Sequence, residues 1–408
     1  MTKLFEINNG KLTANLHPGQ TKAWDSKARF TWIIAGTQSG KTSFEPLWLD
    51  REIKNCGDGD YLAVTATYDL FKLKFLPEMK SYFCDLFNWQ YAASEKVIWK
   101  NEGAQKYRII LRSANAEGGL ESATGKAALL DECGQDEFGL GAWEAVQRRL
   151  SLSQGRVLGG TTPYNLGWLK TEVFDRWRGG DKNHQVIQFS SIMNPAFPVE
   201  EYNRAKATLP AWKFEMFYNG NFSRPAGLIY GDLTDNHYIK PFAIPASWPR
   251  YIGIDPGPNN TAVIWIAKNP ETKCYYLYRE YLDGDKTTHE HANAIKLLSY
   301  NENIHHWALG QKSEKQYRLD WQNEGLPVNE PNITDVDAGI DRVIALIKSK
   351  TFYIFDNLKG CKDQFGTYSR KLDDTGQPTT DIKDKEKFHY LDAVRYCVIG
   401  FDDTWSVI

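Results

Sequence analysis

The sequence contains few cysteines, and none of them forms a CxxC pair. Six are scattered through the 408 residues: Cys56, Cys84, Cys133, Cys274, Cys361 and Cys397. Zinc sites usually draw on closely spaced cysteines, and disulfide frameworks occur mainly in small secreted chains. The pattern therefore argues against a zinc site and indicates a reducing compartment.

The sequence also lacks an excess of charge and long apolar runs. Lys and Arg number 49 against 51 Asp and Glu, so no overall basic field points to nucleic acid, and any such contact must depend on local patches. No stretch approaches the roughly 20 apolar residues of a membrane-spanning helix, and no signal-peptide core, repeat or low-complexity tract is visible. We expect a soluble, intracellular protein without a membrane partner.

The length is sufficient for two domains, each with its own core. Residues 194–248 are rich in proline, glycine and aromatic residues. We therefore predict a first domain over 1–193, a linking subdomain over 194–248 and a second domain over 249–408.

The stretch from Ala35 to Thr42 reads AGTQSGKT and follows the apolar run Phe30–Ile34. A strand, a glycine-bearing turn and a helix over 43–53 would direct backbone N–H groups and a helix N-terminus at a polyphosphate. This spacing is that of a Walker A loop, with Ala35 at the position of its first glycine. Lys41 would reach the β- and γ-phosphates, and the Thr42 hydroxyl would hold Mg²⁺. The other loop residues predicted to bind the nucleotide are Gly36, Ser39 and Gly40. An ordinary strand-to-helix turn is the alternative.

A second chemical element is the segment KAALLDE, Lys126–Glu132, an apolar run that ends in two acids. A buried strand ending at Asp131 would deliver its carboxylate to Mg²⁺, and Glu132 would orient the water that attacks the γ-phosphate. This is the Walker B arrangement. An apolar run that ends in two acids is by itself a common way for a strand to end. Because Asp131 follows the Walker A lysine, Lys41, by 90 residues, the two motifs together support a nucleotide site.

Three weaker signals flank these motifs. In HPGQ, residues 17–20, the Gln20 amide and the nearby Trp24 ring could recognise adenine, although a surface turn is the alternative. In VLGGTTP, residues 157–163, Thr161 could sense the γ-phosphate, or the segment could be a plain strand-to-loop turn. The candidates for a cation that neutralises the γ-phosphate are Arg148, Arg149 and Arg112. Each could equally be a solvated or DNA-contacting side chain.

The two halves predict different α/β folds. In the first, the strand at Tyr61–Thr67 and the helix over 70–83 continue a βαβ rhythm, which favours a mostly parallel sheet with flanking helices, a P-loop NTPase fold. The second half shows the order βββαβαβα of an RNase H-like mixed α/β domain. Its predicted strands are 251–255, 261–268, 274–281, 305–309 and 327–328, with helices over 288–300 and 313–324.

An RNase H-like fold gathers acids from its first strand, its fourth strand and a late helix around two divalent ions, which cleave phosphodiesters. Asp255 fits the first strand, and Asp392 fits the late helix with His389 three residues before it. The fourth strand, His305–Leu309, carries no acid at its end, so we take Glu314 as a provisional metal ligand. Asp255 could instead be a turn residue before proline, and His389 a helix-surface residue.

Basic residues gather near this site and could contact phosphates without reading bases. They are Lys312, Lys315 and Arg318, and a second set around the predicted hairpin tip at 376–378 comprising Arg370, Lys371, Lys383, Lys385 and Lys387. Acids are interleaved with the second set, so a solvated face is the alternative.

Taken in order, these segments resemble the large terminase subunit of tailed bacteriophages. HPGQ, AGTQSGKT, ALLDE and GGTTPYN are similar to its adenine-binding, Walker A, Walker B and coupling motifs. NPAFPVEEY, GLIYG, IGIDPG, SEKQYRLDW, DAGIDRV and HYLDAVRY are similar to its linker and nuclease segments. One departure concerns the Walker A loop, where many relatives have an arginine and this chain has Gln38.

The resemblance implies an ATP-driven motor that threads double-stranded DNA through a portal protein into a procapsid, and a nuclease that cuts the concatemer. Lys41, Thr42, Asp131 and Glu132 would serve ATP and Mg²⁺, while Asp255 and Asp392, with His389 nearby, would serve nuclease metals, Mg²⁺ or Mn²⁺. A ring on the procapsid, a monomer when free and a small terminase partner are implied. So is a place in the host cytoplasm at the portal vertex, outside the mature virion.

Two other functions remain open. The chain could be a DNA-stimulated translocase or helicase whose second half only grips DNA, since the fourth-strand acid is missing. It could also be a nucleotide-dependent adaptor that assembles at the portal. The catalytic pattern of Lys41, Asp131 and Glu132 argues against the adaptor, because a protein that only binds nucleotide does not need Glu132.

Overall fold

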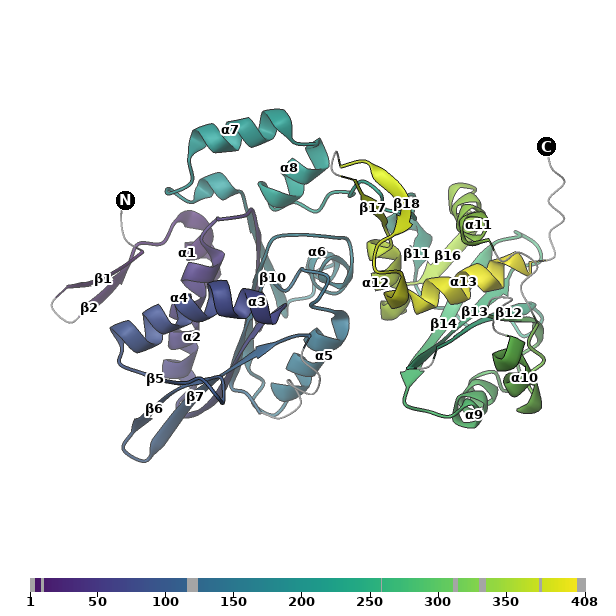
Figure 1. The fold of residues 1–408 in the computed structure, drawn as a ribbon, viewed down its shortest axis with the longest axis horizontal. Coiled ribbons are helices and arrows are strands. Elements are labelled where there is room, and N and C mark those ends of the chain that lie inside the picture. Colours follow the sequence, from purple (N-terminus) through teal and green to yellow (C-terminus); the bar gives the residue numbers. More distant parts are fainter. Residues whose placement is uncertain are drawn as a thin grey trace. The chain divides into compact units, whose positions relative to one another are not determined.

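The computed structural model describes residues 4–8, 11–115, 124–257, 259–310, 315–329, 335–373 and 376–401 (Figure 1). The chain divides into two compact units, Met1–Pro225 and Ala226–Ile408. The residues predicted to form a linking subdomain are shared between them. Helices α7 (Val199–Thr208) and α8 (Ala211–Phe217) belong to the first unit, and strand β11 (Tyr238–Ile239) belongs to the second.

The first unit is built on an eight-stranded sheet with the order β10-β3-β9-β8-β4-β7-β6-β5. The six strands from β10 to β7 are parallel, whereas β6 and β5 extend the sheet in antiparallel fashion. The bounds are β3 Phe30–Ala35, β4 Gly59–Thr65, β5 Gln90–Ala92, β6 Val97–Glu102, β7 Gln105–Ser113, β8 Ala127–Asp131, β9 Arg156–Thr161 and β10 His184–Phe189. The mostly parallel sheet is confirmed. The antiparallel extension and the N-terminal hairpin of β1 (Phe5–Asn8) and β2 (Lys11–Ala14) were not predicted.

Helices cover both faces of this sheet. One core includes Phe44 and Trp48 of α2 (Lys41–Cys56) and Ala23 of α1 (Pro18–Asp25). The other includes Trp143 of α5 (Leu140–Arg149). Every residue of β3 and β8 is buried, as expected for parallel strands covered on both sides. Their continuous apolar sequences therefore follow from their place in the sheet.

The helix predicted over 70–83 forms a longer helical segment containing two π-helical stretches. It runs through α3 (Tyr68–Leu70), η1 (Phe71–Phe75), α4 (Leu76–Lys80) and η2 (Ser81–Leu86), with η1 and η2 as the π-helical parts. The first unit also contains η3 (Leu169–Phe174) and α6 (Asp175–Arg178). Among the described residues, no helix has both the length and the apolar character needed to cross a membrane.

The second unit contains a six-stranded mixed sheet with the order β11-β16-β14-β13-β12-β15. The antiparallel core of β12, β13 and β14 is flanked by parallel β15 and β16, which fits the predicted RNase H-like fold. The bounds are β12 Arg250–Pro256, β13 Asn260–Lys268, β14 Tyr275–Gly284, α9 Thr288–Leu298, β15 Ile304–Leu309, α10 Lys315–Asn323, α11 Val336–Lys348, β16 Phe352–Phe355, α12 Lys359–Thr367 and α13 His389–Ile399. The strand predicted at 327–328 was wrong: neither residue is in a strand, and the bridge to β15 is made by the next residue, from Asn329 to Ala308.

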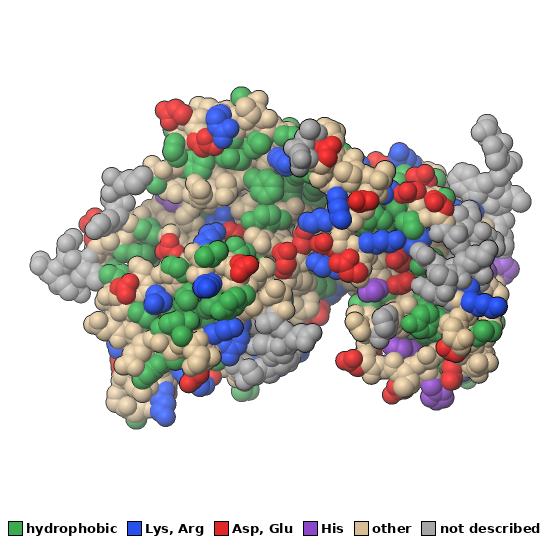
Figure 2. All heavy atoms as spheres, in the orientation of Figure 1, with side chains coloured by type: hydrophobic (Ala, Val, Ile, Leu, Met, Phe, Trp, Pro, Cys, Tyr) green, Lys and Arg blue, Asp and Glu red, His purple; other side chains and the backbone are tan. Residues whose placement is uncertain are grey.

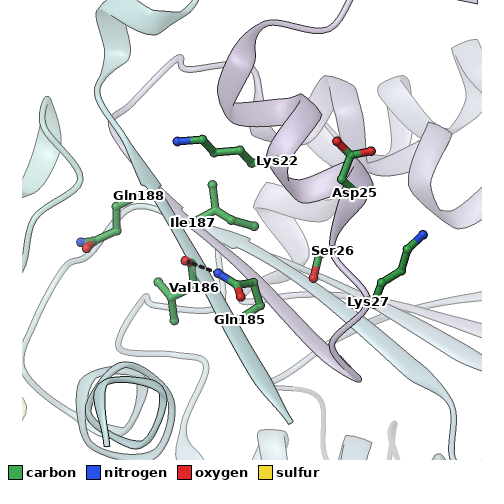
Figure 3. A pocket seen from close by; sticks show the side chains of 8 residues that line it. All are labelled: Lys22, Asp25, Ser26, Lys27, Gln185, Val186, Ile187 and Gln188. Carbon is green, nitrogen blue, oxygen red and sulfur yellow. Dashed lines mark hydrogen bonds between the residues drawn. The ribbon is translucent and has the colours of Figure 1, made fainter. Parts of the chain in front are cut away.

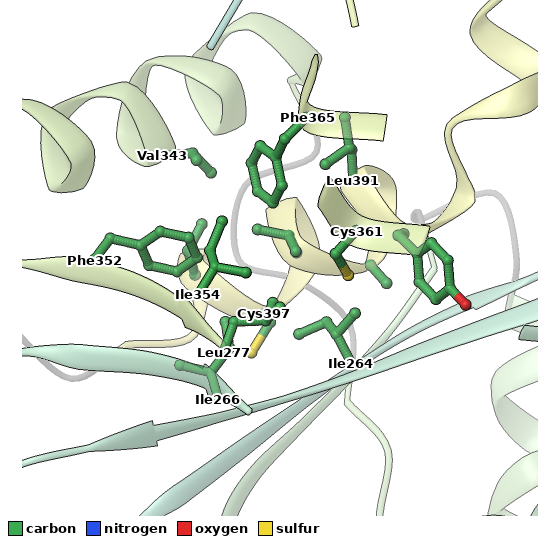
Figure 4. Close-up of a cluster of buried hydrophobic side chains, with 14 of the residues drawn as sticks. Ile264, Ile266, Leu277, Val343, Phe352, Ile354, Cys361, Phe365, Leu391 and Cys397 are labelled. Atoms are coloured by element: carbon green, nitrogen blue, oxygen red, sulfur yellow. The ribbon is translucent and has the colours of Figure 1, made fainter. Parts of the chain in front are cut away.

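Successive side chains of β13 point to opposite faces of the sheet and contribute to two hydrophobic cores. Ile264 and Ile266 face the cluster formed with α11, α12 and α13 (Figure 4), whereas Val263 and Trp265 pack with residues of α9 and α10. Gly253 allows α13 to lie close to β12, since a Cβ there would be 2.0 Å from the Ala393 carbonyl oxygen. The start of α13 is thereby brought to the end of β12.

The predicted basic hairpin is present as β17 (Arg370–Leu372) and β18 (Pro378–Ile382). Arg370 pairs with Asp337, and Lys387 pairs with Asp384 at 3.3 Å. Figure 2 shows basic and acidic side chains interleaved on this face of the second unit. The cluster is thus partly neutralised within the chain.

Candidate nucleotide and metal sites

The predicted phosphate loop connects β3 to α2 and has the required left-handed turns. Gln38 has φ 52° and Gly40 has φ 87°. At Gly36 a Cβ would lie 2.3 Å from the Tyr218 carbonyl oxygen, so any side chain there would displace the loop. Thr37 N donates to the Phe217 carbonyl at 2.6 Å. The loop is therefore held from outside by the last residue of α8 and the residue that follows it.

The Lys41 ammonium lies inside this loop. Its Nζ donates to the carbonyl oxygens of Ala35 (3.1 Å) and Gly36 (2.8 Å) and to Thr162 Oγ1 (3.2 Å). Burial lowers the pKa of Lys41. The buried Ser39 Oγ has no hydrogen-bond partner among the described residues. A buried ammonium and an unpaired hydroxyl on one loop fit the oxygen atoms of a polyphosphate.

The Walker B strand brings Asp131 to Thr42. Thr42 Oγ1 donates to Asp131 Oδ1 at 3.0 Å, while the buried Asp131 Oδ2 has no partner among the described residues. Burial, with a contribution from Glu132, raises the pKa of Asp131 to about 7. A hydroxyl and a carboxylate with a spare oxygen are the hard donors that Mg²⁺ prefers. The predicted Mg²⁺ ligands therefore fit this ion.

Glu132 follows with φ 52°, an uncommon conformation for a residue other than glycine. Its Oε1 accepts from Lys74 Nζ at 2.8 Å and its Oε2 accepts from the Tyr164 hydroxyl at 3.1 Å. Burial alone would raise the pKa of Glu132, but Lys41 and Lys74 outweigh this effect and lower it. The carboxylate is thus ionised and fixed at both oxygens. Lys74 and Tyr164 were not identified from the sequence.

A third acid, Glu45, was also missed. It lies on α2 one turn after Thr42, is fully buried, and neither carboxyl oxygen has a partner among the described residues. Burial and the neighbouring Asp131 raise its pKa well above the usual value, which favours the neutral acid. Gly160 makes room for it, since a Cβ there would lie 2.1 Å from Glu45 Oε1.

The HPGQ segment supports the loop. His17 Nδ1 accepts from Gly19 N (3.1 Å), so Nε2 is free to carry the proton and donate to the Ser39 carbonyl (3.0 Å). Gln20 Nε2 donates to the Gly40 carbonyl at 2.9 Å. The Trp24 ring lies 4.3 Å from the Arg51 guanidinium carbon. An adenine contact by Gln20 stays a prediction.

Thr161, predicted as the phosphate sensor, is committed to the backbone. Its hydroxyl donates to the Thr162 carbonyl (2.9 Å) and accepts from Gly134 N (2.9 Å). The hydroxyl in contact with Lys41 belongs instead to Thr162.

Two of the three candidate arginines lie away from the Walker residues. Gly125 N, just before β8 begins, donates to the Arg149 carbonyl at 3.0 Å. Arg148 and Arg149 therefore lie at the amino edge of the sheet, opposite the end of β8 that carries Asp131. Arg112 Nη1 donates to the Leu111 carbonyl at 2.8 Å.

In the second unit, Asp255 at the end of β12 meets the first turn of α13. His389 Nδ1 lies 2.9 Å from Asp255 Oδ2, and Arg395 donates to Asp392 Oδ1 at 2.6 Å. Burial raises the pKa of Asp255, and the hydrogen bond that His389 donates to the Asp255 carboxylate raises the pKa of His389. The structure thus brings together the three predicted residues of this site.

The fourth-strand position remains without an acid. Strand β15 runs parallel to β12 and pairs Leu309 with Ile254, and Gly310 N donates to the Ile254 carbonyl at 3.1 Å. Glu314 lies outside the described residues. Within the described residues, no group of three or more histidine, cysteine, aspartate or glutamate side chains could hold a metal. Asp255 and Asp392 are suitable oxygen donors, but Asp255 is also bonded to the His389 imidazole and Asp392 to the Arg395 guanidinium.

A separate cavity of about 530 Å³ lies in the first unit between α1 and β10 (Figure 3). It is lined by Lys22, Asp25, Ser26, Lys27, Gln185, Val186, Ile187 and Gln188. None of these residues belongs to the predicted sites.

The fold and these sites define a P-loop NTPase unit followed by an RNase H-like unit. No family model matches the sequence. The chain is similar to the large terminase subunit of Escherichia phage T5, with 26% identity over 189 residues. This match covers 43% of each protein, so it spans less than half of the phage T5 protein.

Among solved structures, the large terminase of bacteriophage HK97 is similar over 95% of both chains, with a TM-score of 0.50 and 12% identity. A large terminase from the thermophilic bacteriophage D6E has a TM-score of 0.48 and 14% identity over 94% of this chain and 98% of that chain. The HK97 likeness shows a shared fold. The phage T5 match shows similarity to a large terminase subunit over less than half of this chain.

Proposed function

We propose that this chain is the motor subunit of a viral genome-packaging machine. It hydrolyses ATP in its first unit to move double-stranded DNA through a portal into a procapsid, and it cleaves concatemeric DNA with its second unit. The observation that carries the proposal is the convergence of Lys41, Thr42, Asp131 and Glu132 around one loop. Similarity to large terminases supports the biological setting.

In the ATPase site, Lys41 and the loop amides bind the phosphates, and Thr42 and Asp131 would hold Mg²⁺. The ion would supply positive charge to the transferred phosphoryl group. Glu132 orients the attacking water and receives its proton, for which an ionised carboxylate is required. The low pKa that Lys41 and Lys74 impose on Glu132 keeps it ionised at neutral pH.

In the nuclease site, Asp255 and Asp392 would be ligands of the divalent ions, Mg²⁺ or Mn²⁺. Such ions would supply Lewis-acid activation of a water and charge stabilisation for the leaving oxygen of a phosphodiester. His389 orients the Asp255 carboxylate through its 2.9 Å hydrogen bond, and Arg395 orients Asp392.

The proposed partners are double-stranded DNA, a portal protein, a small terminase subunit and further copies of this chain. The copies form a ring on the procapsid, and the free chain is a monomer. The complex acts in the host cytoplasm at the portal vertex and is absent from the mature virion.

Displacement of a third DNA strand from linear duplex DNA, measured with the purified protein and ATP, tests the motor. The wild type should displace the strand and hydrolyse ATP faster when DNA is present. Glu132→Gln should lose both activities, whereas Asp255→Asn, altered only in the second unit, should keep them. If Glu132→Gln displaced the third strand as well as the wild type does, the proposed motor function would be contradicted.

One observation favours a second candidate, a DNA translocase whose second unit only binds DNA. Asp255 and Asp392 already have basic partners, His389 and Arg395, and the described part of β15 ends without an acid. Measurement of plasmid cleavage, described below, separates this candidate from the nuclease.

A further inference from the structure

The Glu132 carboxylate is clamped between two side chains from separate segments. Lys74 lies in η1, 58 residues before Glu132, and its Nζ is 2.8 Å from Oε1. Tyr164 follows β9, and its hydroxyl donates to Oε2 at 3.1 Å. Because one partner grips each oxygen, rotation of the carboxylate breaks at least one hydrogen bond. Two directional bonds of this kind fix an orientation better than one.

The clamp lies within a cluster of buried acids, where a nearby cation stabilises the ionised Glu132. Glu45, Asp131 and Glu132 are three buried acids, each less than a tenth exposed. Lys41 faces them but directs its Nζ hydrogen bonds to the loop and Thr162. Lys74 supplies the direct ion pair to Glu132, with its side chain 46% exposed and that of Glu132 only 6% exposed.

The candidate arginines do not provide this contact. Arg148 and Arg149 lie at the opposite edge of the sheet, and Arg112 bonds to backbone carbonyls near its own strand. Gln38 of the phosphate loop is uncharged and cannot supply a cation. The cation that contacts Glu132 is therefore Lys74, which lies in η1 of the same chain.

We propose that Lys74 is a positioning residue for ATP hydrolysis, which with Tyr164 fixes the Glu132 carboxylate in the orientation that activates water. This inference rests on the proposed ATPase function. It assigns the orientation of the base to a lysine and a tyrosine outside the Walker motifs. Lys74 acts through Glu132 and contributes little to nucleotide binding.

The test compares ATP turnover and nucleotide affinity in Lys74 variants. Lys74→Met should lower kcat at least tenfold, while the Kd for a fluorescent ADP analogue with Mg²⁺ changes less than threefold. Lys74→Arg, which keeps the charge and a donor, should restore part of kcat. Tyr164→Phe should lower kcat less than Lys74→Met does, because it removes a neutral hydrogen bond and leaves the ion pair. Lys72→Met is the matched control, because Lys72 is an exposed lysine in the same π-helical stretch.

Three results would overturn the inference: a kcat for Lys74→Met within twofold of wild type, a kcat above wild type, or a loss of nucleotide affinity as large as the loss of kcat. Melting temperatures equal to that of the wild type would show that a loss of kcat is not caused by unfolding. If Lys74→Met is unstable, the kcat of Lys74→Arg tests the inference instead. Glu132→Gln separates this inference from the proposed function. If Glu132→Gln is inactive but Lys74→Met is normal, only the inference fails. If Glu132→Gln is fully active, the ATPase assignment fails.

Discussion

The Thr42 hydroxyl donates a 3.0 Å hydrogen bond to the Asp131 carboxylate, which joins the start of α2 to the end of β8 across 89 residues of sequence. The bond places two oxygen ligands side by side, one from each Walker motif. It also leaves Asp131 Oδ2 without a partner among the described residues. Thr42 and Asp131 therefore already present adjacent oxygen ligands for Mg²⁺ in this structure.

Removing the Thr42 hydroxyl should uncouple nucleotide binding from Mg²⁺. We expect Mg²⁺ to increase the affinity of the wild type for ADP. In Thr42→Ala this increase should be at least tenfold smaller, because one oxygen ligand of the ion is gone. Thr42→Ser keeps the hydroxyl and should retain most of it. Titration with ADP in Mg²⁺ and in EDTA measures the gain, and a full Mg²⁺ effect in Thr42→Ala would contradict the assignment.

Gly160→Ala should destabilise the first unit. The new Cβ would be 2.1 Å from Glu45 Oε1 and cannot be accommodated without a shift, so we expect a loss of about 1–3 kcal/mol in the free energy of unfolding. Glu45→Ala in the same chain should recover part of this loss. Gly141→Ala in α5 is the control, because its Cβ would meet nothing within 4 Å. Additive effects of Gly160→Ala and Glu45→Ala in denaturant unfolding would show that the two residues do not meet.

His184 should make the stability of the chain depend on pH. Burial lowers its pKa from 6.5 to about 4, and its Nδ1 accepts a hydrogen bond from Trp32 Nε1 at 3.1 Å. The unfolded chain takes up a proton near pH 6.5 while the folded chain does not, so stability should fall as the pH drops from 6.5 towards 4. His184→Asn, which keeps an acceptor, should have a melting temperature that changes less over this range. Parallel curves for the two proteins below pH 6.5 would contradict this role, and a constant difference above pH 7.5 is the internal control.

The sequence was most informative where chemistry and local pattern coincide. The strand, turn and helix around Lys41 and the strand that ends at Asp131 both follow from apolar runs and glycine positions. The order of strands in the second unit was sufficient to bring Asp255 and Asp392 to one site. These predictions concern residues whose positions are fixed by the secondary structure on which they lie.

Other features could not be read from the sequence because they depend on tertiary contacts. Lys74 lies in a stretch with several lysines, and only folding selects it for Glu132. In the sequence, Glu45 looks like an exposed residue of α2. In the structure its side chain is buried, because Gly160 has no side chain to occupy the same space. Arg148 and Arg149 were attractive because they follow the Walker B motif, but α5 carries them back to the amino edge of the sheet.

Cleavage of supercoiled plasmid in Mg²⁺ or Mn²⁺ most directly tests the central claim, that the two units carry separate chemistries. We expect the wild type to cut, Asp255→Asn to lose at least a hundredfold in rate, and Glu132→Gln to cut like the wild type. Rapid cutting by Asp255→Asn would contradict the nuclease site. If neither metal supports cutting while DNA-stimulated ATP hydrolysis persists, the second unit only binds DNA.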